Sequence, residues 1–432
     1  MKNIFTLLVL LASFQLNAQW ETFNTANVPE LKSDNIKSVV FSPNNNNLWF
    51  GTSDGLTRYD GDVWVTYTAA SDDIAANEVN DITYAKSGYG PELWLSTQNG
   101  ASVVAIETDG ITAATPYRTG NSGIASNLVF SNGVSTAGNV IFGTDKGVST
   151  LVNSDWKNIT GIDSTNLVKY PVKSIATSKD GYSYLGSTGG GVYQYQDDVD
   201  GITLATVYEI PWSFVPSDTI TTVFVDNNGN QWYGSNQGAG FHVGIQAKEG
   251  WTYYSTDDGL PDKVVNTIIE DSQGNIWFGT NNGLAMKKGQ DWTIYTTADG
   301  LASNVIHDIA QDNNSVLWIA TDNGISKFSP PWTGISQPNT TNTFQLNVHP
   351  NPARDGVYIR YNLPQSGTAR VAVFDLSGRM IRQLVYGFNV AGEHEIFWNT
   401  AGDNGNYADA GIYVVRIQSN NLTTTKKMVI LR

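Results

Sequence analysis

Few side chains in this 432-residue sequence are suited to acid–base or metal chemistry. It has four histidines and no cysteine, which excludes thiolate nucleophiles, thiolate metal sites and disulfides. His307 stands next to Asp308, and a histidine beside a carboxylate is the minimum for general-base catalysis. Adjacent residues of a β-strand point to opposite faces, so this pair is not expected to act together. The sequence contains no Gly-x-Ser-x-Gly elbow and no histidine cluster, and we therefore predict that the protein is not an enzyme.

Acidic side chains offer a second kind of chemistry, the binding of calcium by carboxylate oxygens. Asp197, Asp198 and Asp200 stand close together between Gln196 and Gly201 and are predicted calcium ligands, with a solvated acidic loop as the alternative. Two other aspartates, Asp226 and Asp271, occur in the segments DNNGN and DSQGN. For these two we favour a carboxylate that caps its own turn, because no downstream glutamate completes an ion cage. The sequence indicates no cofactor other than calcium.

Most of these residues belong to a sequence pattern that occurs seven times. Each copy has an aromatic or aliphatic anchor residue, a Gly-Thr or similar pair and a glycine-containing turn, and the anchors are 41 to 48 residues apart. The anchors are Trp49, Trp94, Ile141, Tyr184, Trp232, Trp277 and Trp318. Each copy contains four short strand-like segments separated by turn residues, which is typical of one propeller blade. The sequence therefore predicts an all-β, seven-bladed β-propeller over residues 19–328, with the repeated tryptophans packed between blades.

The seventh repeat lacks its fourth strand. After Phe328 the sequence continues with SPPW, whereas a segment with the fourth-strand pattern precedes the first repeat. In that segment Trp20 and Phe23 match Trp292 and Tyr295 of the sixth repeat. We predict that residues 20–31 pair with residues 305–328 and complete the seventh blade, because such pairing leaves no open sheet edge between the first and last blades.

Alignment of the repeats places one residue of each copy at the start of the innermost strand. In a propeller, these starts surround one mouth of the central channel. The aligned polar residues are Lys37, Asn80, Lys173, Thr221, Asn266 and His307, with Phe130 in the remaining blade. Convergent donors in a concave site suit a carboxylate or a sugar, so these six residues are the predicted ligand-binding ring. A solvated channel entrance is the alternative.

The N-terminus and the charge limit the location and the partners of the protein. Lys2, the apolar segment IFTLLVLLASF and the small residues before Gln19 fit a cleavable secretion signal over residues 1–18. No other segment is long and apolar enough to span a membrane. Residues 20–343 contain 15 Lys and Arg against 34 Asp and Glu, so they repel phosphate backbones. Nucleic acid is therefore not an expected partner.

The last part of the sequence is organised differently. Residues 329–343, SPPWTGISQPNTTNT, are uncharged and rich in proline, and they are predicted to be a linker. The repeat period ends there, and residues 344–432 contain short alternating segments such as GVYIRYNL and ARVAVFDL. This pattern predicts a second all-β domain, an Ig-like β-sandwich.

Residues 344–432 also resemble a known family. HPNP (349–352), VFDLSGR (373–379), AGIYVVRI (410–417) and the terminal KKMVILR are similar, in order, to motifs of the type A sorting domain of the type IX secretion system of Bacteroidetes. The resemblance implies export across the outer membrane, recognition by the secretion machinery and, often, removal of the domain with attachment to surface lipopolysaccharide. The features that it implies for recognition fall on Pro350, Asn351, Pro352, Gly378, Arg379, Gly411, Tyr413, Lys426, Lys427 and Arg432.

The repeats resemble a second family. Residues 271–284, DSQGNIWFGTNNGL, are similar to the core of the two-component-regulator propeller repeat, and residues 226–235 match well, whereas Ile141 stands where that repeat has tryptophan. Propellers of this family often form the periplasmic ligand-sensing part of hybrid histidine kinases. These 432 residues show no kinase pattern and no membrane helix, so the resemblance implies the scaffold and a tendency to bind ligands.

These observations lead to one expected function and two alternatives. We expect an exported propeller, secreted or held at the cell surface, that binds a glycan, a peptide or a protein without catalysis. The first alternative is a lyase or hydrolase that acts on extracellular polysaccharide; a lyase similar to the streptogramin-inactivating propellers would need a histidine paired with a carboxylate. The second is a structural surface protein without a small ligand. A propeller fold is compatible with all three.

Overall fold

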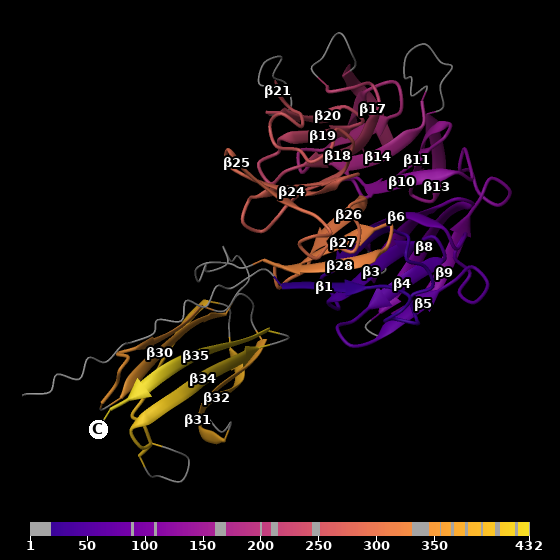
Figure 1. Cartoon of the computed structure of the whole chain (residues 1–432). Helices are drawn as coiled ribbons and strands as arrows, with labels where there is room; N and C mark the ends of the chain where they lie inside the picture. The colour runs from indigo at the N-terminus through magenta and orange to yellow at the C-terminus, as the bar shows by residue number, and fades with distance from the viewer. Residues whose placement is uncertain are drawn as a thin grey trace, which may run out of the picture. The chain divides into compact units, whose positions relative to one another are not determined.

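The computed structural model describes residues 19–87, 90–107, 110–159, 170–198, 201–208, 215–243, 251–330, 345–354, 356–363, 367–375, 379–389, 392–401, 407–419 and 422–431. The predicted secretion signal and nearly all of the predicted linker lie outside these residues and stay predictions. The chain divides into two compact units, Met1–Thr333 and Gly334–Arg432, which we describe separately. Every described element is a β-strand, which confirms the all-β class, and the described residues include no helix able to span a membrane (Figure 1).

The first unit consists of seven four-stranded antiparallel sheets, numbered here as blades in chain order. Blade 1 contains β2 (Ile36–Ser42), β3 (Asn47–Thr52), β4 (Gly55–Tyr59) and β5 (Trp64–Tyr67), and blade 2 contains β6 (Val79–Ser87), β7 (Gly90–Thr97), β8 (Gly100–Glu107) and β9 (Gly110–Tyr117). Blade 3 contains β10 (Val129–Val134), β11 (Val140–Thr144), β12 (Gly147–Val152) and β13 (Asp155–Ile159), and blade 4 contains β14 (Val172–Thr177), β15 (Tyr182–Ser187), β16 (Val192–Asp198) and β17 (Gly201–Tyr208). Blade 5 contains β18 (Ile220–Val225), β19 (Gln231–Ser235), β20 (Gly238–His242) and β21 (Trp251–Tyr254), and blade 6 contains β22 (Val265–Glu270), β23 (Ile276–Thr280), β24 (Gly283–Lys288) and β25 (Asp291–Tyr295). Blade 7 contains β26 (Ile306–Gln311), β27 (Leu317–Thr321), β28 (Gly324–Ser329) and, from the other end of the unit, β1 (Gln19–Phe23).

The seven sheets form a closed ring. The first strand of each blade contacts the first strand of the next blade, and β26 of blade 7 contacts β2 of blade 1. The sheets are arranged around a common centre (Figure 1). A four-stranded sheet is too small to be stable alone, but stacking around a ring buries both of its faces. The first unit is therefore the β-propeller that the sequence predicts.

The N-terminal strand closes the ring as predicted, although it is shorter than expected. β1 pairs antiparallel with β28, with Trp20 opposite Phe328 and Phe23 opposite Ile325. The pairing covers only residues 19–23. The chain then turns, and Val28 and Leu31 pack into the core between blades 7 and 1 rather than extending the strand. The ring thus has no unpaired edge at the junction of its two ends.

The repeated tryptophans and aspartates serve packing and turns, as predicted. Trp277 is fully buried, and its indole Nε1 donates a hydrogen bond of 2.8 Å to the Asp271 carboxylate. The other carboxylate oxygen of Asp271 accepts the backbone N–H groups of Gln273 and Asn275 in the following turn. Asp226 and Trp232 repeat this arrangement. These carboxylates therefore cap their own turns.

A β-bulge interrupts the first strand of every blade at the same position. The register shifts fall between Ile36 and Ser38, Val79 and Asp81, Val129 and Ser131, Val172 and Ser174, Ile220 and Thr222, Val265 and Thr267, and Ile306 and Asp308. The extra residue in each blade is the residue of the predicted ring, or Phe130 in blade 3. A bulge locally breaks the alternation of a strand, so two successive side chains can turn toward the channel.

The second unit is a sandwich of two sheets. One sheet contains β29 (Gln345–His349), β30 (Val357–Leu363) and β33 (Gly392–Trp398), and the other contains β31 (Gly367–Asp375), β32 (Met380–Asn389), β34 (Gly411–Ser419) and β35 (Leu422–Ile430). Side chains from both sheets share one core, in which Ile359, Val371, Trp398, Val415 and Met428 are buried. The alternating strands of the sequence thus form a two-layered β domain.

Candidate functional site at the channel mouth

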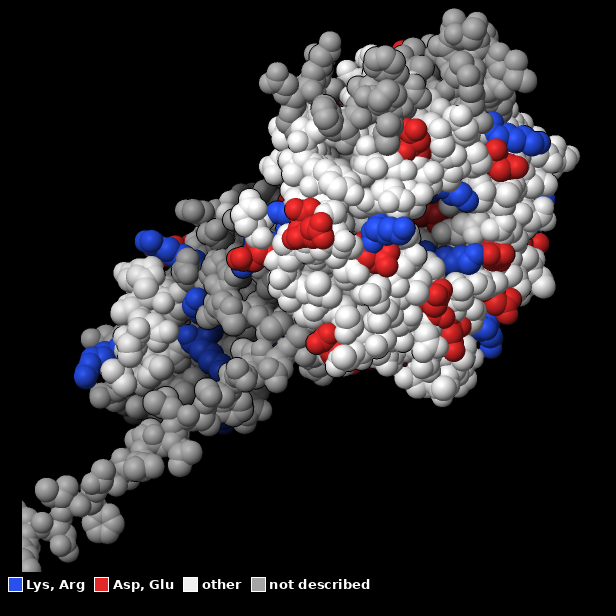
Figure 2. Space-filling view, turned by 45° about the horizontal axis from the view of Figure 1, so that its top comes forward, with Lys and Arg blue, Asp and Glu red and all other residues white. Residues whose placement is uncertain are grey.

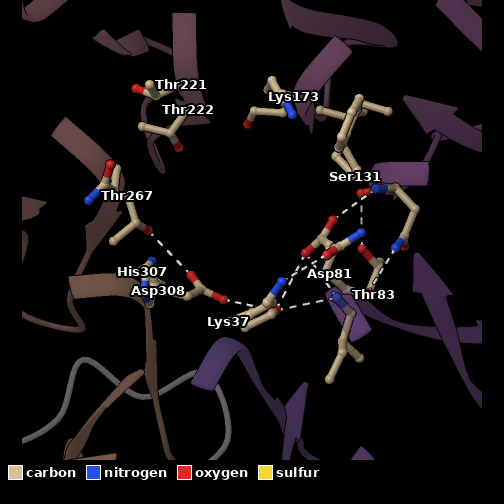
Figure 3. A pocket seen from close by; sticks show the side chains of 18 of the residues that line it. Lys37, Asp81, Thr83, Ser131, Lys173, Thr221, Thr222, Thr267, His307 and Asp308 are labelled. Atoms are coloured by element: carbon tan, nitrogen blue, oxygen red, sulfur yellow. Dashed lines mark hydrogen bonds between the residues drawn. The ribbon is translucent and has the colours of Figure 1, made fainter. Parts of the chain in front are cut away.

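The six residues of the predicted ring line a single cavity of about 320 Å³ at the start of the innermost strands. This volume lies at the lower end of the range for small-molecule sites. Fifteen of the nineteen lining residues have polar side chains, and the labelled side chains converge on the cavity from different blades (Figure 3). Figure 2 shows basic and acidic side chains close together around a hollow in a face that is otherwise mostly uncharged.

A second ring lies directly beneath the first, and the sequence analysis missed it. Its members are the residues that follow each bulge: Ser38, Asp81, Ser131, Ser174, Thr222, Thr267 and Asp308. All seven line the same cavity, and each carries a hydroxyl or a carboxylate. That uniform chemistry, one position after the predicted ring in every repeat, was the available sequence signal. It was overlooked because a regular strand would have turned these side chains away from the channel.

Three residues of the predicted ring use their donors within the fold. The amide of Asn80 donates to the carbonyl of Val129 at 2.7 Å, and the amide of Asn266 donates to the carbonyl of Ile306 at 2.8 Å. Thr221 makes the equivalent bond to the carbonyl of Val265. In each case the acceptor belongs to the next blade. We call these contacts the closed junctions (Asn80–Val129, Thr221–Val265 and Asn266–Ile306).

The second ring also connects neighbouring blades. The carboxylate of Asp308 accepts the backbone N–H of Val39 at 2.8 Å, which joins blade 7 to blade 1. Asp81 accepts the backbone N–H of Asn132 at 2.8 Å, and the Ser174 hydroxyl accepts that of Val223 at 2.9 Å. Backbone N–H groups at the channel wall thus find acceptors on the preceding blade, so these side chains stabilise the closed ring.

Two carboxylates of the second ring meet at one hydroxyl. Ser38 Oγ lies 3.0 Å from Asp308 Oδ2 and 3.4 Å from Asp81 Oδ1. Burial raises the pKa of Asp81 to about 7, and the negative charge of Asp308 adds to this shift against the hydrogen bonds from the backbone. Burial also raises the pKa of Asp308. A serine hydroxyl has one proton to donate, so the pair is most stable when Asp81 is protonated.

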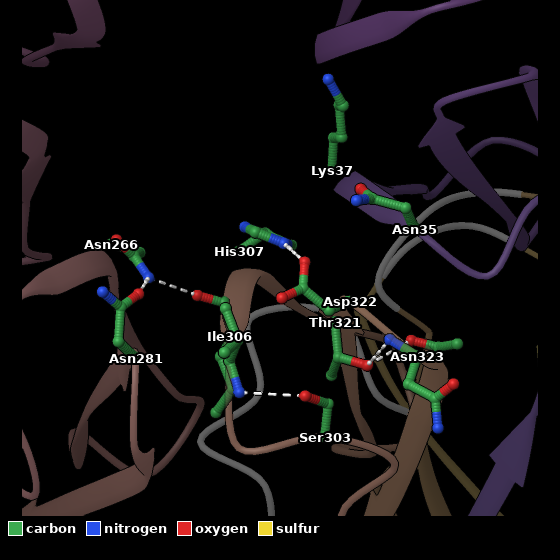
Figure 4. Close-up of polar contacts among 12 residues, drawn as sticks. Asn35, Lys37, Asn266, Asn281, Ser303, Ile306, His307, Thr321, Asp322 and Asn323 are labelled. Atoms are coloured by element: carbon green, nitrogen blue, oxygen red, sulfur yellow. Dashed lines mark hydrogen bonds and ion pairs between the residues drawn. The ribbon is translucent and has the colours of Figure 1, made fainter.

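Two of the three cations of the predicted ring have acidic partners. The Lys37 ammonium forms an ion pair with Glu78, in the loop before β6. His307 Nε2 lies 2.6 Å from Asp322 Oδ1, in the turn between β27 and β28 (Figure 4). His307 and Asp308 both line the cavity, so the expectation that they face opposite ways is wrong; the bulge is the reason. The carboxylate that contacts His307 is nevertheless Asp322, which the sequence analysis did not single out because it follows fifteen residues later.

The third cation has no acidic partner within the part of the chain that the structure describes. Lys173 forms none of the ion pairs found among the described residues, and its Nζ lies 3.1 Å from the centroid of the Phe130 ring. Burial lowers the pKa of Lys173; the negative charge of Asp145 opposes this shift, and the positive charge of Lys37 adds to it. Ser131 of β10 is 3 % exposed, and its hydroxyl has no hydrogen-bond partner among the described residues. We call Phe130, Ser131 and Lys173 the open junction.

The structure describes two of the three predicted calcium ligands and places both in a strand. Asp197 and Asp198 end β16 and pair with β17 instead of forming a loop. Asp197 is partly buried and accepts a hydrogen bond from Ser183 Oγ at 2.6 Å, whereas Asp198 is exposed. Asp200 lies outside the described residues, and those that are described include no group of three or more potential metal ligands among His, Asp and Glu. Calcium binding stays a prediction.

The described residues of the predicted sorting signal lie at one end of the sandwich strands or along β35. Asn351, between Pro350 and Pro352, donates to the carbonyl of Lys427 and accepts the N–H of Val429, which attaches HPNP to β35. Arg379 forms an ion pair with Asp375, Gly411 begins β34, and the Tyr413 hydroxyl donates to the carbonyl of Asp409. Lys426 and Lys427 are exposed on β35. Gly378 and Arg432 lie outside the described residues.

Comparison with protein families finds a match within each unit. A model of the secretion system C-terminal sorting domain matches residues 347–431. The chain carries a type IX sorting domain. A model of the two-component-regulator propeller matches residues 259–282 and 300–323, within blades 6 and 7. The sorting domain indicates export to the cell surface or the medium and implies an interaction with the type IX secretion machinery.

Solved structures share the fold at low sequence identity. The extracellular domain of a putative hybrid two-component system from B. thetaiotaomicron is 18% identical with a TM-score of 0.60, and covers 95% of this chain and 57% of its own. PorZ, a surface component of the type IX secretion system of Porphyromonas gingivalis, is 20% identical with a TM-score of 0.54, and the match covers 93% of this chain and 60% of PorZ. This chain thus spans less than two thirds of either protein. A streptogramin B lyase is 16% identical with a TM-score of 0.55, and the match covers 72% of this chain and 98% of the lyase. Comparison with curated proteins finds no match.

Proposed function

We propose that this protein is a ligand-binding propeller at the cell surface or in the medium, and that its ligand occupies the cavity at the channel mouth. The ligand would be a glycan, a peptide or a protein segment. The sorting domain would deliver the propeller through the type IX machinery, and attachment to lipopolysaccharide is what the family implies for many such proteins.

One observation carries the proposal. Every blade contributes two side chains to one polar cavity, and part of that lining, the open junction, has polar groups without partners among the described residues. Partly buried polar groups without partners cost free energy in the folded state, so a ligand that supplies partners gains affinity. A purely structural channel would be expected to satisfy these groups within the protein, as the closed junctions do.

The test is a depletion assay on the purified full chain. The protein is incubated with soluble and insoluble polysaccharides and with peptides, with and without calcium, and the unbound protein is measured. We expect selective retention on one ligand, and loss of that retention in His307→Trp, which places a large ring over the cavity. Val63→Trp, at a residue that is 52% exposed, is the matched control. The proposal would be rejected if His307→Trp were retained as strongly as the wild type. It would also be rejected if the wild-type protein were retained on none of the ligands.

A second candidate function rests on the contact between His307 and Asp322. A histidine with one ring nitrogen bonded to a carboxylate and the other free to face a substrate has the arrangement of a general base. Figure 4 shows the second ring nitrogen of His307 directed away from Asp322. In this case the propeller would cleave an extracellular polysaccharide. Product release that disappears in His307→Gln, with retained binding, would support catalysis, and retention without any product would reject it.

A further inference from the structure

We infer that the ligand of the channel mouth is an acidic sugar, and that the open junction holds its carboxylate. The inference rests on the proposed function, and it names the ligand class and the residue that selects it. Lys173 is the selecting residue, with Ser131 beside it.

The first step concerns the charge that the cavity lacks. Lys37 and His307 have carboxylate partners, whereas Lys173 lies on the face of Phe130 and forms no ion pair with any described residue. An aromatic face stabilises an ammonium by less than a partly buried carboxylate does. Figure 3 shows Lys173 across the cavity from Lys37 and Asp308. An anion bound at Lys173 would complete its contacts and offset the repulsion between the two ammonium groups.

The second step concerns how much negative charge the site tolerates. Asp308 lines the same cavity, and residues 20–343 carry 34 acidic against 15 basic residues. A doubly charged phosphate or a densely sulfated chain would meet this field at every position. A single carboxylate carries one negative charge, and the Lys173 ammonium provides one positive charge to balance it. The geometry therefore favours a monoanionic group.

The third step concerns the body of the ligand. The lining of the cavity as a whole consists mainly of hydroxyl and amide side chains, and only Val39, Ile82, Phe130 and Ile175 are apolar. An apolar peptide side chain would bury little surface there, whereas a sugar ring presents hydroxyl groups that both donate and accept. Ser131, which lines the cavity, has its Oγ over Gly143 without a hydrogen-bond partner among the described residues. A uronic acid combines the carboxylate and the hydroxyls that this wall suits.

The experiment compares charged and neutral forms of one ligand. Trisaccharides of glucuronic, galacturonic, mannuronic and guluronic acid, each with its methyl ester, are titrated into the full chain by calorimetry. We expect at least one uronate to bind and its methyl ester to bind about 10- to 100-fold more weakly, the range for one charge-assisted contact. Lys173→Met should weaken the uronate by a similar factor and leave the ester unchanged. Lys287→Met is the matched control, because Lys287 also lies against aromatic rings but outside the cavity.

Each other outcome rejects the inference in a recognisable way. Equal binding of uronate and ester, or uronate binding that is insensitive to Lys173→Met, shows that the carboxylate is not held there. Binding of neutral sugars alone, or of peptides whose C-terminal carboxylate depends on Lys173, rejects the acidic sugar but leaves the ligand-binding function intact. If no uronate binds and the depletion assay also fails, both proposals are rejected.

Discussion

The closed junctions and the open junction lie at the same channel mouth of the propeller, yet they use equivalent positions differently. At the closed junctions Asn80, Thr221 and Asn266 donate to a carbonyl of the next blade. At the open junction Phe130 has no donor and the hydroxyl of Ser131 has no partner. Equivalence within a repeat therefore fixes where a side chain lies but not what it does. The side chains available to a ligand are those that the scaffold leaves without a partner.

Removal of β1 is the most severe test of whether its pairing with β28 is needed to keep the ring closed. Blade 7 receives its fourth strand from β1, and Trp20 and Phe23 pack against the cores on either side. Deletion of residues 19–23 exposes an unpaired edge and these cores, so the melting temperature should fall by about 10 °C or more, with aggregation. Calorimetry and light scattering measure both effects, with a chain that begins at Gln19 as the control. An unchanged melting curve would show that side-chain links alone close the ring.

A pair of substitutions tests the difference between linked and unlinked side chains. Asp308→Ala removes the acceptor of the Val39 and Ile309 N–H groups and should cost on the order of 2–3 kcal/mol. Ser131→Ala removes no hydrogen bond and should change stability by less than about 0.5 kcal/mol. Urea denaturation of both variants gives the comparison. Similar losses in the two variants would remove the distinction between linked and unlinked side chains.

The most gradual expected effect is a pH dependence of stability at Asp81. Its pKa is about 7 in the folded protein and near 3.8 when unperturbed, so between these pH values the folded state binds a proton that the unfolded state has lost. This contribution to stability decreases as pH rises through that window, by at most about 1.4 kcal/mol per pH unit, and is constant above it. Asp81→Asn keeps an oxygen for the N–H of Asn132 but cannot titrate. The difference in melting temperature between wild type and this variant should therefore vary from pH 4 to 7; a constant difference would contradict the shift.

The fold was readable from the sequence because its determinants are local. Strand alternation, glycine-containing turns and the match of Trp20 and Phe23 to a fourth strand each depend on a few neighbouring residues. The predicted closing strand, residues 20–31, is longer than the observed one. The reason is that Val28 and Leu31 are apolar residues that enter the core from a turn rather than from a strand. Apolar spacing alone did not separate these two cases.

The candidate site was only partly readable. Alignment found the first ring, but the second ring depends on bulges, and nothing in a single repeat marks a bulge. The donors of Asn80 and Asn266 are used by carbonyls about 40 to 49 residues away, which depends on how neighbouring blades stack. The contact of Asp322 with His307 also depends on the folded blade, because the β26–β27 hairpin brings these two residues together. Contacts between elements decide which polar side chains are available, and local patterns do not contain that information.

The pairing of β1 with β28 has a consequence for the order in which the protein folds. Glu21 and Lys327, which form an ion pair across these strands, are 306 residues apart. During synthesis from the N-terminus, the first strand must wait without its partner until the last blade has been made. The entropy lost in closing so long a loop grows only slowly with its length, but contacts between distant residues form slowly. Closure of the ring is therefore expected to be a late event, and a chain halted before β28 would present a free strand at one end and an unpaired blade at the other.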